Sequence, residues 1–270
     1  MFVTNIFDED QANVIAIGLE YCEECEEFLN SIEFASECVE CFDGDKKKNL
    51  LENVRIFYKK QRVKDLQEVS SIVKEIRDKE KVPLLLDRGH LPSYFSIKAL
   101  ECDKILVFDA HCDLKSKYVP ELIEFDVWRE PEKFNGGTWL RRLSEVVEPE
   151  KIILFGVRSF DEDEFKYMKE KGITFFTPRM IKKGKALSVL KQIEGEVYIS
   201  LDMDVFDPSI APAVDYPEPG GINFFDFQDI LENIDAKVIG CDVCCIKPIK
   251  GNLVTEFLAV RSTFEMLSKI

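Results

Sequence analysis

Residues 104–114 read KILVFDAHCDL, an apolar run of strand-forming residues that ends in acids alternating around a histidine. Side chains two residues apart in an extended segment share a face, so Asp109, His111 and Asp113 are expected to point together. Ionised carboxylates that converge in this way repel one another and resist burial unless a cation neutralises them. The stretch therefore predicts a buried strand that delivers metal ligands where it ends.

Further apolar runs along the chain are typical of buried strands, and amphipathic segments alternate with them. The strand candidates are NVIAIGL (13–19), VPLLL (82–86), KIILFGV (151–157), VYISL (197–201) and KVIGCDV (237–243). Helices are predicted between and after them, over residues 64–77, 94–100, 161–171, 225–234 and 255–270. This alternation indicates a parallel sheet that is covered by helices on both faces. In such sheets, the functional residues lie in loops beyond the carboxyl ends of the strands.

A second acidic run and both histidines lie at comparable places. LDMDVFDP at 201–208 follows a predicted strand, and Asp202 and Asp204 share one face of the extended segment. The chain contains only two histidines, His90 and His111, and each follows an apolar run. A solvated loop or a capped turn can explain either acidic run alone. Together, four acids and two imidazoles suit two divalent cations such as Mn²⁺, and ions held roughly 3.5–4 Å apart can share and activate one water.

These segments resemble the signature motifs of the ureohydrolase family, which includes arginases, agmatinases and formimidoylglutamases. DAHCDLK at 109–115 matches the family's Asp-Ala-His-x-Asp motif, and SLDMDVFDPSIAP at 200–212 matches Ser-x-Asp-x-Asp-x-x-Asp-Pro. PEPGG follows at 217–221, and His90 stands where the family has the histidine of Gly-Gly-Asp-His. The resemblance runs from about residue 80 to residue 270 and favours the agmatinase-like members.

The resemblance implies a three-layer α/β/α fold with a mainly parallel sheet, as one domain over residues 1–270. It implies two Mn²⁺ ions held by six side chains: Asp109 and Asp202 as bridges, His90 and Asp113 at one ion, and His111 and Asp204 at the other. It also implies a hydrolase acting on C–N bonds other than peptide bonds. A metal-bridging hydroxide would cleave a small guanidino or amidino compound, and many family members are trimers or hexamers.

The chain departs from the family pattern on the substrate side. Residues 87–90 read DRGH, so the family's acid before the histidine is missing. A family segment that carries a further histidine aligns with NGGT at 135–138, where Gly136 stands instead. CIKP at 245–248 aligns with Glu-Val-Asn-Pro, so Cys245 replaces the glutamate that grips the guanidinium. A thiol cannot form the paired charge-assisted hydrogen bonds that a planar guanidinium favours.

Other acids can take over the missing role. We expect Asp204 and Glu218 as catalytic residues, and Asp215, Gly136 and Cys245 as residues that contact the substrate. The departures keep two alternatives open. One is a metal-binding relative without catalytic activity, and the other is a hydrolase of a non-guanidino amide.

Four of the nine cysteines form two Cys-x-x-Cys pairs in an acidic stretch at about residues 20–50. The pairs are Cys22 with Cys25 and Cys38 with Cys41, twelve residues apart. Such spacing is typical of zinc sites, and a short helical hairpin between the pairs would bring them together. We expect a cysteine-rich insertion that holds one structural Zn²⁺. An iron–sulfur cluster or two disulfides are the alternatives.

The composition disfavours several classes of partner. The net charge of −15 argues against binding to nucleic-acid backbones or anionic membranes. No apolar stretch approaches the roughly 20 residues of a membrane span, and the first residues lack the features of a signal peptide. We therefore expect a cytoplasmic protein. The resemblance implies that it acts on a small molecule and forms a homo-oligomer, either a trimer or a hexamer.

Overall fold

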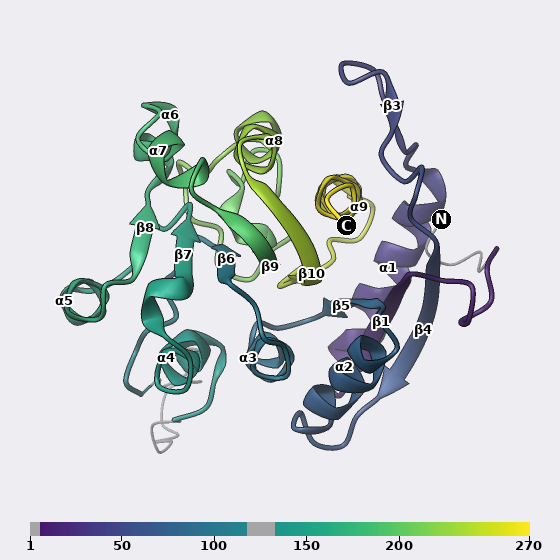
Figure 1. Ribbon diagram of the computed structural model, residues 1–270, viewed down its shortest axis with the longest axis horizontal. Helices are drawn as coiled ribbons and strands as arrows, with labels where there is room; N and C mark the ends of the chain where they lie inside the picture. Colours follow the sequence, from purple (N-terminus) through teal and green to yellow (C-terminus); the bar gives the residue numbers. More distant parts are fainter. Residues whose placement is uncertain (1–5, 118–132) are drawn as a thin grey trace.

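The computed structural model describes residues 6–117 and 133–270 (Figure 1). The predicted single domain over 1–270 also contains residues 1–5 and 118–132, which lie outside the described residues. The central strands are β1 (Val14–Glu20), β4 (Ile56–Arg62), β5 (Val82–Asp87), β6 (Lys104–Phe108), β7 (Ile152–Phe155), β8 (Thr174–Phe176), β9 (Glu194–Asp202) and β10 (Asp235–Cys244). They form one parallel sheet, as the sequence predicts, and the structure gives the strand order β4-β1-β5-β10-β9-β6-β7-β8.

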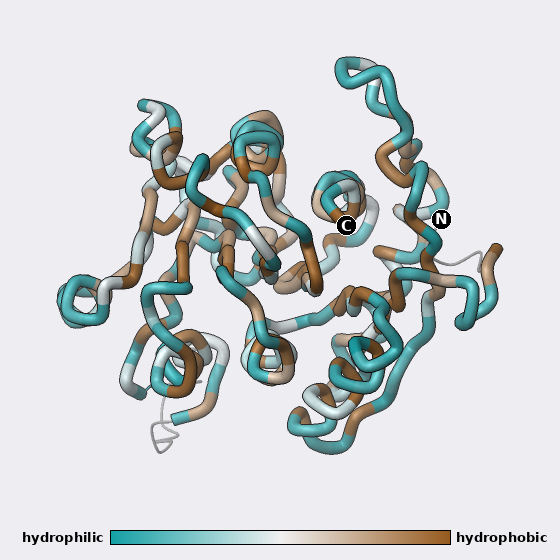
Figure 2. The backbone as a smooth tube through the Cα atoms, in the orientation of Figure 1, coloured by the Kyte–Doolittle hydropathy of each residue, from teal (hydrophilic) through white to brown (hydrophobic). Residues whose placement is uncertain are grey.

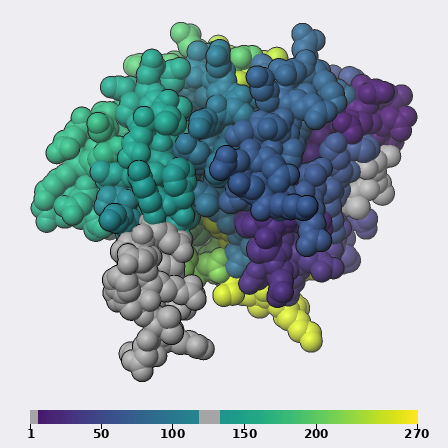
Figure 3. All heavy atoms as spheres, turned by 90° about the horizontal axis from the view of Figure 1, so that it is seen from below, coloured from purple at the N-terminus to yellow at the C-terminus, as the bar shows by residue number. Residues whose placement is uncertain are grey.

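Helices cover both faces of this sheet. One face packs against α1 (Glu24–Cys38), α6 (Pro178–Lys182), α7 (Leu187–Leu190), α8 (Phe224–Glu232) and α9 (Val254–Leu267). The other packs against α2 (Glu68–Asp78), α3 (Leu91–Lys98), α4 (Trp139–Ser144) and α5 (Glu162–Lys171). The second face is seen from below in Figure 3, where the blue to teal segments that include α2, α3 and α4 cover the middle of the molecule. The predicted three-layer α/β/α fold is confirmed.

The strands supply two apolar cores, one on each side of the sheet. Alternation along β5 illustrates this, since Leu84 and Leu86 belong to the core under α1 and α9, while Leu85 belongs to the core under α2 and α3. All six residues of β5 are buried, which explains its continuous apolar run. Figure 2 shows apolar residues gathered along the strands and polar residues on the outer surfaces of the helices. Within the described segments, no helix combines the length and apolarity needed to cross a membrane.

The cysteine-rich stretch differs from its prediction. It forms one continuous 15-residue helix, α1, followed by a small hairpin of β2 (Phe42–Asp43) and β3 (Lys48–Asn49). Cys25 lies in the first turn of α1 and Cys38 is its last residue. At 1.5 Å per residue they are about 20 Å apart, so the two Cys-x-x-Cys pairs lie at opposite ends of the helix. The prediction of one zinc ion held by all four thiols is therefore wrong, and no group of three or more ligands in the described residues includes them.

The strand order places the loops that follow four neighbouring strands side by side, at the carboxyl ends of those strands. β5, β10, β9 and β6 are consecutive neighbours, and they are the strands that precede the predicted functional residues. Cys244, the last residue of β10, pairs with Asp87 on one side and with Asp202 on the other. Phe108 at the end of β6 pairs with Leu201 of β9, so Asp109 follows directly beside Asp202.

Candidate metal centre

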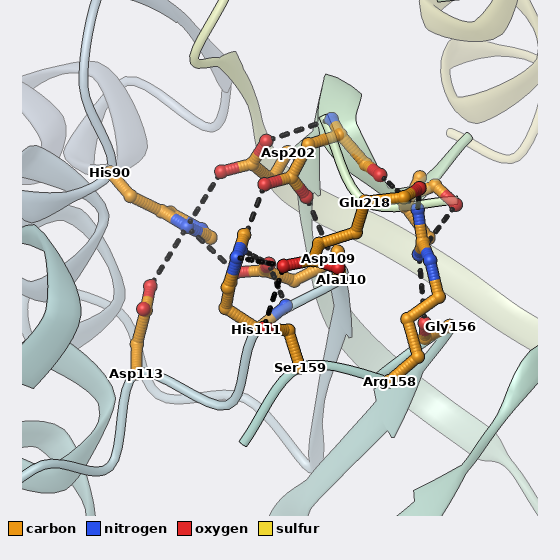
Figure 4. Close-up of polar contacts among 12 residues, drawn as sticks. His90, Asp109, Ala110, His111, Asp113, Gly156, Arg158, Ser159, Asp202 and Glu218 are labelled. Carbon is orange, nitrogen blue, oxygen red and sulfur yellow. Dashed lines mark hydrogen bonds and ion pairs between the residues drawn. The ribbon is translucent and has the colours of Figure 1, made fainter. Parts of the chain in front are cut away.

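The structure brings the six predicted ligands together at the carboxyl ends of the central strands (Figure 4). One group contains His90, Asp109 and Asp113, and another contains Asp109, His111 and Asp204, with ligand atoms within 4.8 Å of one another in each group. Asp109 belongs to both groups, which is the placement that a bridging carboxylate requires. Asp202 lies on the His90 side, with its Oδ2 3.3 Å from His90 Nδ1.

Backbone amides fix the direction of the carboxylates. The N–H of His111 donates to Asp109 Oδ1 at 2.6 Å, and the N–H of Ala110 donates to Asp204 Oδ1 at 2.9 Å. The N–H of Asp204 in turn donates to Asp202 Oδ1 at 2.9 Å. In each case one carboxylate oxygen is held by the chain, and the other oxygen faces a histidine nitrogen at 2.9–3.3 Å. The site is therefore organised by local hydrogen bonds before any cation binds.

His90 carries the clearest sign of a cation site. Its side chain is buried, and Nδ1 has no hydrogen-bond partner of suitable geometry. The same nitrogen lies 3.1 Å from Asp109 Oδ2 and 3.3 Å from Asp113 Oδ2. A buried polar atom without a hydrogen bond is rare, because the desolvation of that atom is then uncompensated. A cation bound between Nδ1 and these carboxylates would satisfy all of them.

A second set of side chains orients His90 and was missed from the sequence. His90 Nε2 lies 3.0 Å from Ser200 Oγ, which donates to Asp242 Oδ1 at 2.8 Å. The Trp139 ring packs on His90 with ring centroids 4.5 Å apart, and its Nε1 donates to Asp113 Oδ2 at 2.7 Å. Partners of this kind fix the orientation of ligands. Ser200 is part of the second acidic motif, so its role has a sequence signal, whereas Trp139 is brought in by tertiary packing alone.

The electrostatics of the cluster show an excess of negative charge. Burial acts to lower the pKa of His111, but hydrogen bonds to Asp109 and Asp204 outweigh it and raise that pKa to about 12. Burial, together with the charges of Asp202 and Asp109, raises the pKa of Asp204 well above its usual value. Burial and the charge of Asp109 raise the pKa of Asp113 to about 6. Four carboxylates beside two imidazoles thus need further positive charge, which divalent cations would provide.

The cluster opens into a pocket of about 580 Å³. Gly136, Asp215, Glu218 and Cys245, the residues predicted on the substrate side, all line this pocket. A Cβ at Gly136 would meet no atom within 4 Å, so this residue leaves space there. A larger hollow of about 920 Å³ between α2 and α3 contains none of the predicted residues. The smaller pocket therefore joins the candidate metal ligands to the candidate substrate residues.

The two acids at the pocket have different surroundings. Asp215 accepts two hydrogen bonds from the Arg88 guanidinium, at 2.5 and 3.0 Å, and lies 3.5 Å from Lys247 Nζ. Burial acts to raise the pKa of Asp215, but the bonds and charge of Arg88 outweigh it and lower that pKa. Glu218 accepts from Ser159 Oγ at 2.9 Å, and no lysine or arginine among the described residues forms an ion pair with its carboxylate. Of the two acids, Glu218 is therefore the one whose carboxylate is available to bind a cationic substrate.

Arg158 holds the loops around the pocket together, and its role was not recognised from the sequence. Its guanidinium donates to the carbonyl oxygens of Asp204 at 2.8 Å and Glu218 at 2.7 Å, and also to those of Gly156, Val205, Phe206 and Pro219 (Figure 4). Gly156 has a φ of 94°, and a Cβ at this position would collide with Val205. Arg158 therefore links the loop after β7 to the segments that carry Asp204 and Glu218.

Asp207 also holds the loop that carries Glu218 in place, through hydrogen bonds to its carboxylate. Its carboxylate accepts from Ser209 Oγ at 2.6 Å and from the N–H groups of Gly220 at 2.9 Å and Gly221 at 3.2 Å. Hydrogen bonds from Ser209, with those from the two glycines, lower the pKa of Asp207 to about 2. The ionised form is thus the one that the folded loop stabilises.

The hydrogen bonds to Asp207 predict that this residue contributes to stability in a pH-dependent way. Because the pKa of Asp207 is lowered on folding, its contribution is present above the usual value of 3.8 and is lost as the pH falls through about 2. We expect Asp207→Asn to lower the free energy of unfolding at neutral pH, with a difference from wild type that shrinks in acid. Guanidinium denaturation over this pH range measures it. Asp163→Asn, at an exposed acid on α5, is the control, and a pH-independent difference would contradict the account.

The arginase family model matches residues 27–268. The chain belongs to the arginase family. Its curated relatives include the agmatinase of Pyrococcus horikoshii, 31% identical over 72% of this chain and 66% of the relative. Another is an uncharacterized 32.2 kDa protein of Methanothermus fervidus, 31% identical over 65% of this chain and 59% of the relative.

Solved structures agree with this membership. The agmatine ureohydrolase of Thermoplasma volcanium superposes with a TM-score of 0.84, at 23% identity, over 99% of this chain and 93% of that chain. The formimidoylglutamase of Bacillus subtilis superposes with a TM-score of 0.77 over 97% of this chain and 88% of that chain, at 20% identity. The resemblance to ureohydrolases that the motifs indicate is confirmed. The chain covers about three fifths to two thirds of the length of the curated relatives it matches.

Proposed function

We propose that this arginase-family protein is a metal-dependent hydrolase that cleaves a C–N bond in a small guanidino or amidino compound. The observation that carries the proposal is the convergence of both histidines with three aspartates, in two ligand groups that share Asp109, at the wall of a pocket, with Asp202 as a fourth aspartate beside His90. Relatives named agmatinase and N(1)-aminopropylagmatine ureohydrolase, the latter from Thermococcus kodakarensis at 29% identity, support the substrate class.

The side chains fit two divalent ions. We assign one ion to His90, Asp109, Asp113 and Asp202, and the other to His111, Asp109, Asp202 and Asp204. The orphaned Nδ1 of buried His90, which three carboxylates surround, supports this fit. Oxygen-rich sites with imidazole suit Mn²⁺. The ions would supply Lewis acidity toward the substrate and would lower the pKa of a water molecule.

The chain's own groups would position the substrate against this centre. The pocket of about 580 Å³ lies within the size range of small-molecule sites. Glu218 Oε1 lies 4.0 Å from His111 Nε2, and Asp204 Oδ2 lies 2.9 Å from His111 Nδ1. We propose that Glu218 binds the cationic head of the substrate beside the metal ligands and that Asp204 fixes His111. Asp215, held by Arg88, and Gly136 would shape the rest of the pocket.

A second candidate function is the hydrolysis of a non-guanidino amide. The pairing of Arg88 with Asp215 favours it. Asp215 is one of the acids that could replace the glutamate for which Cys245 stands, and its charge is already neutralised by Arg88. A metal-binding relative without activity is the third candidate. Assembly into a trimer or hexamer and a cytoplasmic location stay predictions.

Product release separates these candidates. Protein reconstituted with Mn²⁺ would be assayed for urea and ammonia with agmatine, arginine and guanidinobutyrate, and for ammonia with neutral amides. We expect release from at least one guanidino compound, which Asp109→Asn abolishes. Release from amides alone would favour the second candidate, and bound metal without any release would favour the third.

The role of Glu218 gives a sharper prediction. We expect Glu218→Gln to lower kcat/KM for a cationic guanidino compound by about 10–100-fold, because a hydrogen bond to a charged group contributes roughly 1.5–3 kcal/mol. Metal content should not change, since Glu218 lies outside both ligand groups. Steady-state kinetics and elemental analysis measure the two quantities. Glu170→Gln, at an exposed position on α5, is the matched control. An unchanged kcat/KM would show that Glu218 does not bind the substrate.

A further inference from the structure

Two thiols lie beside the His90 side of the candidate metal centre. Cys244 and Cys245 form a group with His90 and Asp202 in which the ligand atoms all lie within 4.8 Å of one another. Cys244 ends β10, where the sheet register places it directly beside Asp202 of β9. The sequence predicts a substrate contact for Cys245, so its grouping with Cys244, His90 and Asp202 is visible only in the fold.

The local geometry directs both thiols toward the cluster. Cys245 has a φ of 66°, a left-handed conformation that is unfavourable for a residue with a side chain. In this conformation its sulfur lies within 4.8 Å of the Cys244 sulfur and of an Asp202 carboxylate oxygen. Cys244 is fully buried, and its sulfur lies within 4.8 Å of a ring nitrogen of His90. A strained turn that brings a thiol into a buried cluster of ligands is typical of a functional site rather than of simple packing.

Ligand chemistry distinguishes this side of the centre from the other. The group around His111 offers only carboxylates and one imidazole, which suit hard cations such as Mn²⁺. The group around His90 and Asp202 adds two sulfur atoms, and thiolate with imidazole selects borderline-soft cations such as Zn²⁺, Co²⁺ and Fe²⁺. Ligand sulfur must be deprotonated, so each coordinating thiol would release its proton to solvent when the cation binds.

We propose that Cys244 and Cys245 are thiolate ligands of the cation held by His90 and Asp202, and that this cation is Zn²⁺ or a similar borderline-soft ion rather than Mn²⁺. The inference rests on the proposed function, because it takes the centre itself as given. It assigns Cys245 to the cation instead of to the substrate. The protein would then hold two chemically different ions, with the harder one at His111.

Cobalt substitution tests the proposal directly. The metal-free full-length chain would be titrated with Co²⁺ and followed by electronic absorption, because thiolate ligands give intense sulfur-to-cobalt charge-transfer bands in the near ultraviolet. We expect such bands in the wild type, weaker bands in Cys245→Ser, and none in the Cys244→Ser/Cys245→Ser double variant. The matched control is Cys22→Ser/Cys25→Ser, which removes a thiol pair 3.0 Å apart at the start of α1 and should keep the bands. Circular dichroism checks that each variant is folded.

Zinc affinity provides a second measurement on the same proteins. We expect Cys245→Ser to lower the Zn²⁺ affinity at least about tenfold, since even residues that only orient metal ligands contribute 10–100-fold. Co²⁺ bound without charge-transfer bands would overturn the thiolate assignment and leave the proposed centre standing. Bands that persist in the Cys244→Ser/Cys245→Ser variant would also overturn it. Failure to bind Co²⁺ at all would overturn both this inference and the proposed function.

Discussion

Asp109→Asn is expected to remove metal binding and activity together, with a loss of about a hundredfold or more in metal affinity. Asp109 is the one residue that both ligand groups share, and its side chain is buried. Its Oδ2 lies 3.1 Å from His90 Nδ1, and its Oδ1 lies 3.5 Å from His111 Nδ1. An amide carries no charge and offers only one oxygen, so it cannot bridge two cations.

Elemental analysis after dialysis, with product release from the guanidino compounds above, measures both losses. Asp207→Asn is the control, because it changes a carboxylate of the same motif that belongs to neither group. We expect this control to keep its metal. Two ions retained by Asp109→Asn would contradict the ligand assignment.

The second large effect is expected at Arg158. Arg158→Met would remove this donor from the carbonyl oxygens of Asp204, Glu218 and four other residues. Among the described residues, only the carbonyl of Val205 keeps another donor, the N–H of Ile222. Since each unsatisfied buried group costs about 1–3 kcal/mol, we expect the free energy of unfolding to fall by about 2–4 kcal/mol, as some carbonyls regain water. Activity should fall as well, because the Glu218 loop is no longer tied to the metal ligands.

The geometry of the guanidinium makes this prediction specific. Arg158→Lys keeps the charge but has a compact ammonium with three donors, so it should recover only part of the stability. Arg179→Met, at an exposed arginine of α6, should change neither quantity. Chemical denaturation followed by circular dichroism gives the free energies. A full rescue by lysine would show that charge, rather than the bridging of several carbonyls, is what matters at this position.

The sheet and the metal ligands could be predicted because their signals are local in sequence. Buried parallel strands are apolar throughout, and the ligands lie at the end of such a run or within five residues after it. The detailed reason was partly different from the prediction, however. β6 ends at Phe108, and Asp113 reaches His90 through a left-handed backbone with a φ of 51°, rather than through strand alternation. The residue types were informative even where the assumed backbone was not.

The cysteine pairs show why spacing alone can mislead. Their separation fits a zinc site, but the residues between them repeat apolar side chains at helical intervals, with Phe28, Leu29, Ile32 and Ala35 all buried. This pattern builds one helix that packs against α9 and the sheet, and that helix separates the pairs. Residues such as Trp139 and Arg158 had no such signal, because their partners lie far away in sequence and meet only after folding.

The central claim is that this cluster binds two divalent cations. Elemental mass spectrometry on protein purified without chelators or nickel affinity steps, before and after reconstitution with Mn²⁺ and Zn²⁺, tests it most directly. We predict two ions per chain, bound in both the wild type and the Asp207→Asn control and lost in Asp109→Asn. Fewer than one ion per chain after reconstitution would contradict the account.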